Sequence, residues 1–286
     1  MRIFALSLVS AFAVWTMQAQ STLLADAEAL YIEQNFTKAQ RMLEKIIAAD
    51  DENPRALHLM ANCLQKQERF VQAVQHYEKA SRIAAPSPAL QTDHAAALIN
   101  LKQYKEAEKL LKKALKSDPD LPEAHYFYGN VKYFDFNLTA ALKHYNKATE
   151  LRTDYRDALY MRAAAYAETG KYHLAVRDYE EVAALDPGLT AARFNIAVIH
   201  LQNDSFEKSA EMLAEINPAD LPSSADYYFS LGEALYFAGE REEACTAYKR
   251  AASEGDEESD RIYKRYCLTK EEREAAERTR TIRMAF

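Results

Sequence analysis

The histidines, serines and carboxylates of this chain are the side chains that could carry catalysis or hold a metal ion. None of the histidines is part of a His-Glu-x-x-His pair, which zinc enzymes place on one helix face; they stand at positions 58, 76, 94, 125, 144, 173 and 200. No serine stands in a Gly-x-Ser-x-Gly turn, and no glycine-rich loop that could hold a phosphate occurs. The acidic run 254–260 lacks the alternating ligand spacing of a calcium loop. The sequence therefore predicts no catalytic residue, no metal and no cofactor, and an enzyme is the least favoured class of function.

The composition narrows the class of partner. The 286 residues are 49% hydrophobic and 28% charged, which is typical of a globular protein. The formal net charge of -7 disfavours nucleic acid and anionic lipid surfaces, because both attract clustered Lys and Arg. Only six glycines and eight prolines occur, too few for the turns of a sandwich or a barrel. Helices must therefore dominate, and nucleic acid is not an expected partner.

The first residues have the layout of an export signal. Met1 and Arg2 form a basic head, residues 3–15 are almost entirely apolar, and a cleavage position follows Ala19. The apolar run is too short for a comfortable membrane span. We therefore expect residues 1–19 to be a cleaved signal peptide and the mature protein to be periplasmic or secreted, with no membrane span. An uncleaved anchor is the alternative.

A pattern with a period of 34 residues covers most of the chain. A mostly aromatic residue recurs at this interval, except for 35 residues in the last step, at Phe36, Phe70, Tyr104, Leu138, Tyr172, Phe206 and Arg241. Three residues after each comes a small residue, four further on a bulky apolar one, and three further on another apolar one. These offsets follow one face of a helix.

A second small residue recurs upstream, in a separate helical stretch, at Ala27, Ala61, Ala95, Gly129, Ala163, Ala197 and Gly232. Two helices joined by a short turn need small side chains where their axes approach within about 8 to 10 Å. The pattern predicts seven helical hairpins, here called repeats 1 to 7, over residues 20–53, 54–87, 88–121, 122–155, 156–189, 190–224 and 225–258. A capping helix over 259–268 and a tail over 269–286 are expected to follow.

This pattern resembles the tetratricopeptide repeat family over about 20–258. The resemblance implies an all-α fold, a right-handed superhelical solenoid of antiparallel helix hairpins. It also implies that the first helix of each repeat lines a concave groove that binds peptides. Repeat 7 departs most from the pattern, because Arg241 stands at the usual aromatic position.

The first helices carry a row of rings on the face that would line this groove. The fifth residue of each repeat forms a row that ends in four aromatics, Tyr126, Tyr160, Phe194 and Phe229. The same face adds rings and carboxamides at Phe127, Asn130, Tyr133, Asn195 and Tyr236. Rings can bury apolar side chains of an extended peptide while carboxamides pair with its backbone. The alternative is that the rings pack against neighbouring helices as core.

A clamp for the C-terminal carboxylate of a partner is disfavoured. Family members that use such a clamp place Lys and Arg on this face, whereas the row itself has none. Arg55, Lys66 and Arg162 are scattered candidates rather than a cluster.

The three cysteines raise the question of whether a disulfide holds the capping helix, as an oxidising compartment would allow. Cys245 lies on the second helix of repeat 7 and Cys267 on the expected capping helix, so a disulfide between them is permitted in an exported chain. Whether the two are bonded is left open by the sequence, and Cys63 is expected to stay a buried thiol. The end of the chain, with Cys245, Gly255-Asp256 and Tyr266-Cys267, resembles the end of some exported tetratricopeptide proteins of Bacteroidetes-type bacteria.

Two functions remain open from the sequence. The leading hypothesis is a non-enzymatic scaffold in the cell envelope that holds a protein or an extended peptide in the concave groove. The alternative is an architectural subunit of a secretion, outer-membrane or cell-wall assembly that docks through its convex face or its cap.

Overall fold

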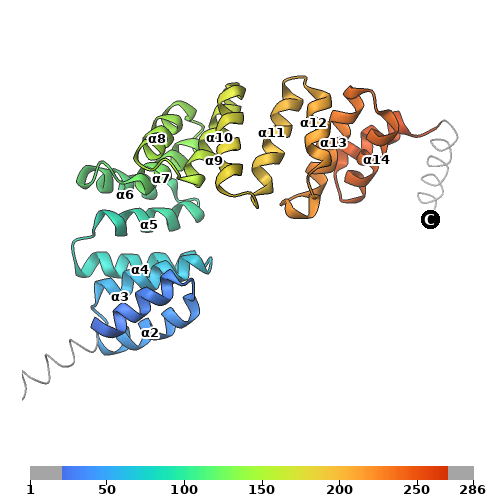
Figure 1. Cartoon of the computed structure of the whole chain (residues 1–286). Coiled ribbons are helices and arrows are strands. Elements are labelled where there is room, and N and C mark those ends of the chain that lie inside the picture. Colours follow the sequence, from blue (N-terminus) through green and yellow to red (C-terminus); the bar gives the residue numbers. More distant parts are fainter. Residues whose placement is uncertain (1–20, 270–286) are drawn as a thin grey trace, which may run out of the picture. The chain divides into compact units, whose positions relative to one another are not determined.

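The computed structural model describes residues 21–269, and within them every regular element is a helix (Figure 1). The all-α prediction is therefore confirmed for this part of the chain. The expected signal peptide 1–19 and nearly all of the expected tail lie outside the described residues. The chain divides into two compact units, an N-terminal unit that ends at Thr153 and a C-terminal unit that begins at Asp154.

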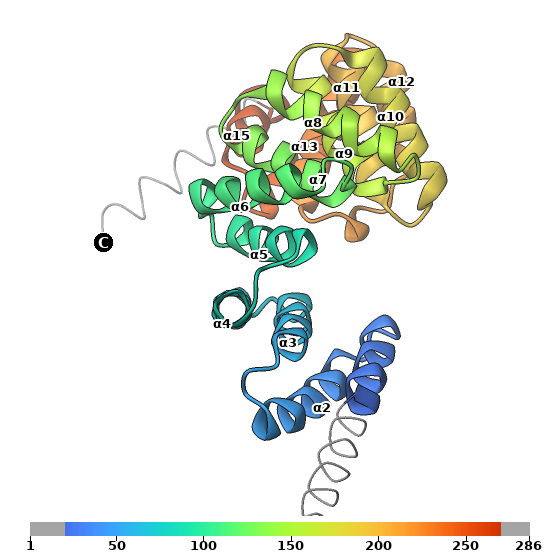
Figure 2. The same ribbon diagram turned by 90° about the vertical axis from the view of Figure 1, so that its left-hand side faces the viewer.

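The N-terminal unit consists of helices that pair with their neighbours in sequence, as α3 does with α4 (Figure 2). Residues 21–32 are helical, and the helices that follow are α2 (Phe36–Ala49), α3 (Pro54–Lys66), α4 (Phe70–Ile83), α5 (Pro88–Asn100), α6 (Tyr104–Ser117), α7 (Pro122–Phe134) and α8 (Leu138–Leu151).

The C-terminal unit continues the same arrangement. Its helices are α9 (Arg156–Glu168), α10 (Tyr172–Leu185), α11 (Thr190–Gln202), α12 (Phe206–Ala214), the short η1 (Pro218–Asp220), α13 (Ser224–Ala238), α14 (Arg241–Ser253), α15 (Glu257–Ile262) and η2 (Tyr263–Cys267).

The helix starts follow the 34-residue pattern. Each second helix of a hairpin, from α2 to α14, begins at the periodic position that runs from Phe36 to Arg241. The first helices α3, α5, α7, α9 and α11 begin at the first residue of repeats 2 to 6, and α13 begins one residue before repeat 7. Three of them start with proline, which fits there because the first N–H of a helix has no partner to lose. The sequence pattern is thus a pattern of helix starts.

The small residues lie where the two helices of a hairpin touch. The second-helix set has no exposed surface in any repeat: Ala39, Ala73, Ala107, Ala141, Ala175, Ser209 and Ala244. On the first helix, glycine is required in two repeats. A Cβ added to Gly129 would lie 2.4 Å from the ring of Tyr145, and one on Gly232 would lie 2.8 Å from the ring of Tyr248. Both rings therefore approach the backbone of the first helix more closely than alanine would allow.

The turn inside each hairpin has one residue in the left-handed region of backbone space. Five of these residues are not glycine, namely Gln34, Glu68, Lys102, Phe136 and Asp204, with φ between 56° and 60°. Gly170 and Gly239 occupy the corresponding position in repeats 5 and 7. A side chain in this region clashes with the following carbonyl and costs roughly 1–2 kcal/mol. The turns at the five other positions therefore retain strain that glycine would remove.

Replacing Phe136 with glycine is expected to stabilise the N-terminal unit by about 0.5 to 1 kcal/mol. The ring is 91% exposed, so almost no packing is lost, and glycine adopts a φ of 56° without a clash. The measurement is the urea midpoint followed by circular dichroism. Phe136→Ala is the control, because it removes the ring but keeps the clash. Equal midpoints for the two variants would contradict the strain at this turn.

The cap of the last hairpin begins earlier than the sequence indicated. We expected it over 259–268, but α15 begins at Glu257 because the carboxylate of Asp256 accepts a hydrogen bond from the Ser259 N–H at 2.6 Å and so caps the helix. α15 and η2 both pack on α14.

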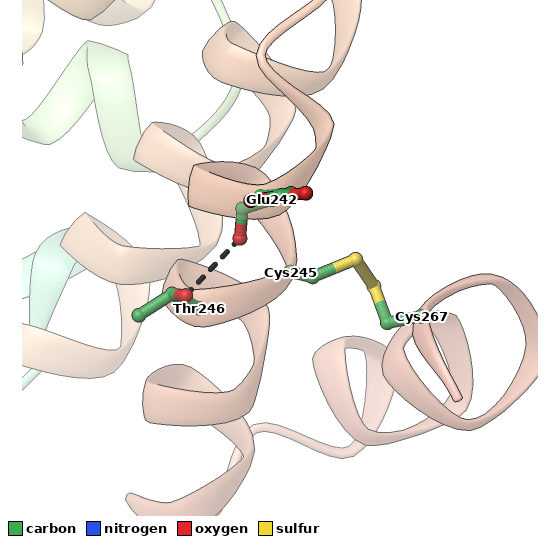
Figure 3. Close-up of a disulfide and its surroundings, with 4 residues drawn as sticks. All are labelled: Glu242, Cys245, Thr246 and Cys267. Atoms are coloured by element: carbon green, nitrogen blue, oxygen red, sulfur yellow. Dashed lines mark hydrogen bonds between the residues drawn. A yellow bond between two sulfur atoms is a disulfide. The ribbon is translucent and has the colours of Figure 1, made fainter. Parts of the chain in front are cut away.

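The cysteines take two different roles. A disulfide joins Cys245 on α14 to Cys267 at the end of η2, with Cα atoms 5.5 Å apart (Figure 3). The bond ties the cap to the last hairpin. Cys63 is a buried free thiol on α3, and burial raises its pKa to about 11.

Candidate protein-binding surface

In the N-terminal unit, the residues expected to bind a peptide lie together on α7. Tyr126, Phe127 and Tyr133 are half-buried, and the rings of Tyr126 and Phe127 have centroids 4.9 Å apart. Asn130 is buried, and its Oδ1 accepts a hydrogen bond of 2.9 Å from the hydroxyl of Tyr145 on α8. The carbonyl oxygen of Asn130 is therefore used in a hydrogen bond within the hairpin. The surface that a ligand could contact on α7 is formed by the three rings.

In the C-terminal unit, the expected residues lie on the three first helices α9, α11 and α13. Tyr160 is half-buried, and its hydroxyl accepts a hydrogen bond of 2.9 Å from Nδ2 of Asn195 in the next repeat. Phe194 packs against the core that contains Leu213, and it also stays partly exposed. The hydrogen bond joins two successive first helices on one face and leaves the carbonyl oxygen of Asn195 available to a ligand.

The last hairpin continues this set of rings. Phe229 stands edge-on to Tyr248 at a centroid distance of 6.3 Å, so the edge of the second ring supports the first. Tyr236 lies edge-on to Phe237 and beneath the guanidinium of Arg241, 5.6 Å from the ring centroid. Both Phe229 and Tyr236 are half-buried. The predicted rings are thus all half-buried, neither fully core nor fully exposed, whereas Asn130 is buried.

A polar cluster on the first helices of the N-terminal unit was missed by the sequence reasoning. Nε2 of His58 lies 2.8 Å from Oδ2 of Asp93, and Nδ2 of Asn62 donates to the same oxygen at 3.3 Å. The pairs His58–Asp93 and Tyr160–Asn195 are both separated by 35 residues in sequence. This shared spacing joins the fifth position of one repeat to the sixth of the next, and it is the signal that could have predicted the cluster.

The structure also gives Arg162 a role that the sequence did not indicate. Its guanidinium makes two hydrogen bonds to the carboxylate of Asp178 on α10, at 2.6 and 3.0 Å. Asp178 has no exposed surface, and the Arg162 side chain is only 13% exposed. Arg162 therefore holds the two helices of repeat 5 together.

Two histidines meet in repeat 4. Nδ1 of His125 and Nδ1 of His144 are 3.1 Å apart, and Nε2 of His125 lies 2.9 Å from the carbonyl oxygen of Pro119. A carbonyl only accepts, so His125 carries its proton on Nε2, and His144 donates through Nδ1 when both rings are neutral. The ring of His144 also stacks on Tyr128, with centroids 4.2 Å apart. Burial, and then the charges of His125 and nearby lysines, lower the pKa of His144 to about 4.

The stability of the N-terminal unit is expected to fall as the pH drops from about 6.5 to 4. The pKa of His144 is lower in the folded chain than in the unfolded one, so the unfolded chain binds more protons in this window. The loss from this residue should be about 2 to 3 kcal/mol, fully developed near pH 4. Urea unfolding at several pH values measures it. Glu108 adds to the loss only at the acid end of this window: hydrogen bonds from Lys112 and Lys132 lower its pKa in the folded chain from 4.5 to about 2, so near pH 4 the unfolded chain binds a proton that the folded chain does not.

His144→Gln is the matched variant, since it keeps a polar side chain that does not titrate. Its stability should change less than that of the wild type between pH 6.5 and 4. Identical pH profiles of the two proteins would show that His144 does not stay neutral in the folded chain.

The described residues 21–269 contain no group of three or more His, Cys, Asp or Glu side chains placed to hold a metal ion. In the same range, no helix is both long and apolar enough to cross a membrane.

Family models match most of the repeats. Models described as tetratricopeptide repeat match residues 92–155, 156–189 and 226–254. A model of subunit 3 of the anaphase-promoting complex, or cyclosome, matches residues 32–114. The match at 156–189 has the bounds of repeat 5.

Curated relatives match about half of this chain. DnaJ homolog subfamily C member 7 of Homo sapiens is 29% identical over 172 residues, which cover 54% of this chain and 35% of that protein. The homolog of Dictyostelium discoideum is 26% identical over 176 residues, with 54% and 32% covered. The chain spans about a third of the length of these relatives.

Solved structures share the fold at low identity. A tetratricopeptide repeat protein from Parabacteroides merdae has a TM-score of 0.59 at 16% identity, covering 86% of this chain and 98% of that one. The Cut9-Hcn1 hetero-tetramer has a TM-score of 0.62 at 16% identity, covering 81% and 42%. The human IFIT1 dimer with PPP-AAAA has a TM-score of 0.63 at 16% identity, covering 82% and 59%.

The repeat spacing, the hairpins and the family models agree on one assignment. The chain belongs to the tetratricopeptide repeat family.

Proposed function

We propose that this protein is a non-enzymatic scaffold that binds a protein or an extended peptide on the face formed by its first helices. The observation that carries the proposal is the set Tyr160, Phe194, Asn195 and Phe229, which presents partly exposed rings and a carboxamide from three successive first helices. A peptide laid across these helices could bury apolar side chains on the rings and pair its backbone with the carboxamide. The Cut9-Hcn1 hetero-tetramer, which shares the fold, is itself an assembly of different proteins.

A displayed library of unstructured peptides tests this proposal. Peptides are selected on the intact protein, and their dissociation constants are measured by fluorescence anisotropy for the wild type and for a groove variant, Tyr160→Ala/Phe194→Ala/Phe229→Ala. We expect the groove variant to bind at least about tenfold more weakly while keeping its helical circular dichroism. Peptides that bind both proteins equally would rule out this face, and global unfolding of the variant would identify the rings as core.

A single-site variant separates binding from folding. Asn195→Ala removes the carboxamide but leaves every ring in place, and Asn195 is only half-buried. It should weaken peptide binding while the thermal midpoint changes little. An unchanged affinity would contradict the role of the carboxamide.

The compartment proposed for this scaffold is the cell envelope or the extracellular space. The export-signal layout of residues 1–19 supports it, and so does the disulfide between Cys245 and Cys267, because disulfides persist in oxidising compartments. Trp15 is the only tryptophan of the chain, so the purified mature protein should emit tyrosine fluorescence alone. Tryptophan emission would contradict cleavage after Ala19.

A further inference from the structure

An apolar cavity of about 510 Å³ lies between α13 and α14 in the last hairpin. Tyr228, Leu231, Leu235 and Ala247 line its apolar part, and the charged side chains Glu243 and Arg250 stand at its rim. It is separate from the peptide-binding face, whose residues on α13 are Phe229 and Tyr236.

The sequence differences between the repeats show which side chain is small at this cavity. The seventh residue of a repeat faces the twenty-third, as shown by the stacked Tyr128 and His144 in repeat 4 and by the ion pair of Arg162 and Asp178 in repeat 5. Large or polar side chains fill the twenty-third position in six repeats, and repeat 7 has alanine; the series is Met42, His76, Leu110, His144, Asp178, Met212 and Ala247. Repeat 2 has a groove of about 450 Å³ at the same positions although His76 stands there, so Ala247 leaves more room in repeat 7 but does not by itself create the space.

The helix before the cavity also fails to cover it. In repeat 2, the groove at the same positions is walled by four residues of the preceding second helix, among them Ile47 and Ala48 near the end of α2. The corresponding residues before repeat 7 are Asn217 and Pro218, which lie beyond the end of α12. α12 has 9 residues, whereas α10 has 14. The lining of the cavity therefore comes from α13 and α14 alone.

The apolar residues of the groove are more exposed in repeat 7 than in repeat 2. Met60 and Leu64 of repeat 2 are 4% and 2% exposed. Their counterparts in repeat 7, Leu231 and Leu235, remain half-buried. In repeat 2 the helix α2 of the preceding hairpin packs over these residues, whereas in repeat 7 no residue of α12 lines the corresponding surface.

The cap does not close the cavity. In Figure 3 the side chain of Thr246, which lines the cavity, and that of Cys245 leave α14 in opposite directions. The disulfide therefore holds α15 and η2 on the other side of α14.

We propose that this cavity is the docking site for an amphipathic helix of a partner protein. Leu231 and Leu235 are one helical turn apart, so two aliphatic side chains of the partner, three or four residues apart, can pack against them. Arg250 already pairs with Glu254 at 2.8 Å and lies over the ring of Tyr228, whereas Glu243 is exposed, so the partner helix needs a basic residue at the Glu243 end. This surface would hold a folded partner by a helix, independently of the extended segment proposed for the first-helix face.

A displayed library of helical peptides, selected on the intact disulfide-bonded protein, tests the proposal. The selected peptides should share two aliphatic residues spaced by three or four and a basic residue at the end that faces Glu243. Ala247→Leu, which copies Leu110 of repeat 3, should weaken their binding by about tenfold or more because it fills the cavity. Thr246→Arg is the second blocking variant; its side chain is exposed, so the substitution leaves the core intact.

The groove variant Tyr160→Ala/Phe194→Ala/Phe229→Ala separates the two proposals. It should bind the helical peptides as tightly as the wild type does, whereas the cavity variants should keep their affinity for extended peptides. Glu243→Lys should weaken peptides with a basic residue at that end and should be rescued by a peptide with glutamate there.

The proposal is overturned if no helical peptide is selected, or if the selected ones are insensitive to Ala247→Leu and Thr246→Arg. Sedimentation that shows a dimer lost in Ala247→Leu would also overturn it, because the occupant would then be a second copy of this chain.

Discussion

Asp178→Ala is expected to lower the free energy of unfolding of the C-terminal unit by about 3 to 5 kcal/mol. The carboxylate of Asp178 is fully buried and accepts two hydrogen bonds from Arg162, at 2.6 and 3.0 Å. Its removal takes away the carboxylate that accepts two hydrogen bonds from the largely buried guanidinium, and breaking a buried ion pair by removing one member costs more than the intact pair contributes. Urea denaturation followed by circular dichroism measures the loss.

A double variant copied from the neighbouring repeat is the matched control. Repeat 6 has Ile196 and Met212 at the positions of Arg162 and Asp178, so Arg162→Ile/Asp178→Met installs an apolar pair that the same fold already accommodates. Its stability should lie within about 1 kcal/mol of the wild type, because replacing both charges removes both desolvation costs. A single variant that loses less than about 1 kcal/mol, or a double variant no better than the single one, would contradict this role of the pair.

Cys245→Ser is expected to destabilise the cap by about 3 kcal/mol, the second large effect. The disulfide closes a loop with a sequence separation of 22, and without it the unfolded cap has more conformations available. The loss should be local, since α15 and η2 contact the rest of the chain mainly through α14. Hydrogen exchange of the amides between 250 and 267 should quicken, while exchange in α9 and α10 stays unchanged.

Reductant provides the control for this variant. Dithiothreitol should accelerate exchange in the wild-type cap to the level of Cys245→Ser and should leave the variant unchanged. An effect of the same size on both proteins would show that the reductant does not act through this bond.

The hairpins were predictable because each depends on local positions that recur. A small residue such as Ala39 and an apolar one such as Leu43 fix one buried face, and seven copies of the pattern locate the helix starts. The start of the cap was less predictable, because it depends on one capping carboxylate, Asp256, that belongs to no periodic position.

The candidate site was only partly predictable, for a different reason. Helical spacing places Tyr160 and Asn195 on the same face, but their hydrogen bond depends on how far one first helix is offset from the next. The burial of Asp178 was not predictable from spacing, because a charged residue on a second helix is most often solvated. Its partner Arg162 stands 16 residues away on the other helix of the hairpin, where the repeat pattern sets no residue type.

The variation at the seventh and twenty-third positions bears on how a repetitive chain avoids mistakes in folding. Hairpins with one backbone plan can exchange helices, and chains of similar repeats misassemble in that way. If α10 paired with the first helix of another repeat, Asp178 would be buried against Tyr128 or Ile196, neither of which can neutralise it. The two helices are joined by a stacked ring pair in repeat 4, by a charged pair in repeat 5 and by apolar residues in repeat 6. The chemistry of this contact therefore differs between three adjacent hairpins. Each second helix therefore packs favourably only against the first helix of its own repeat, although all repeats share one period.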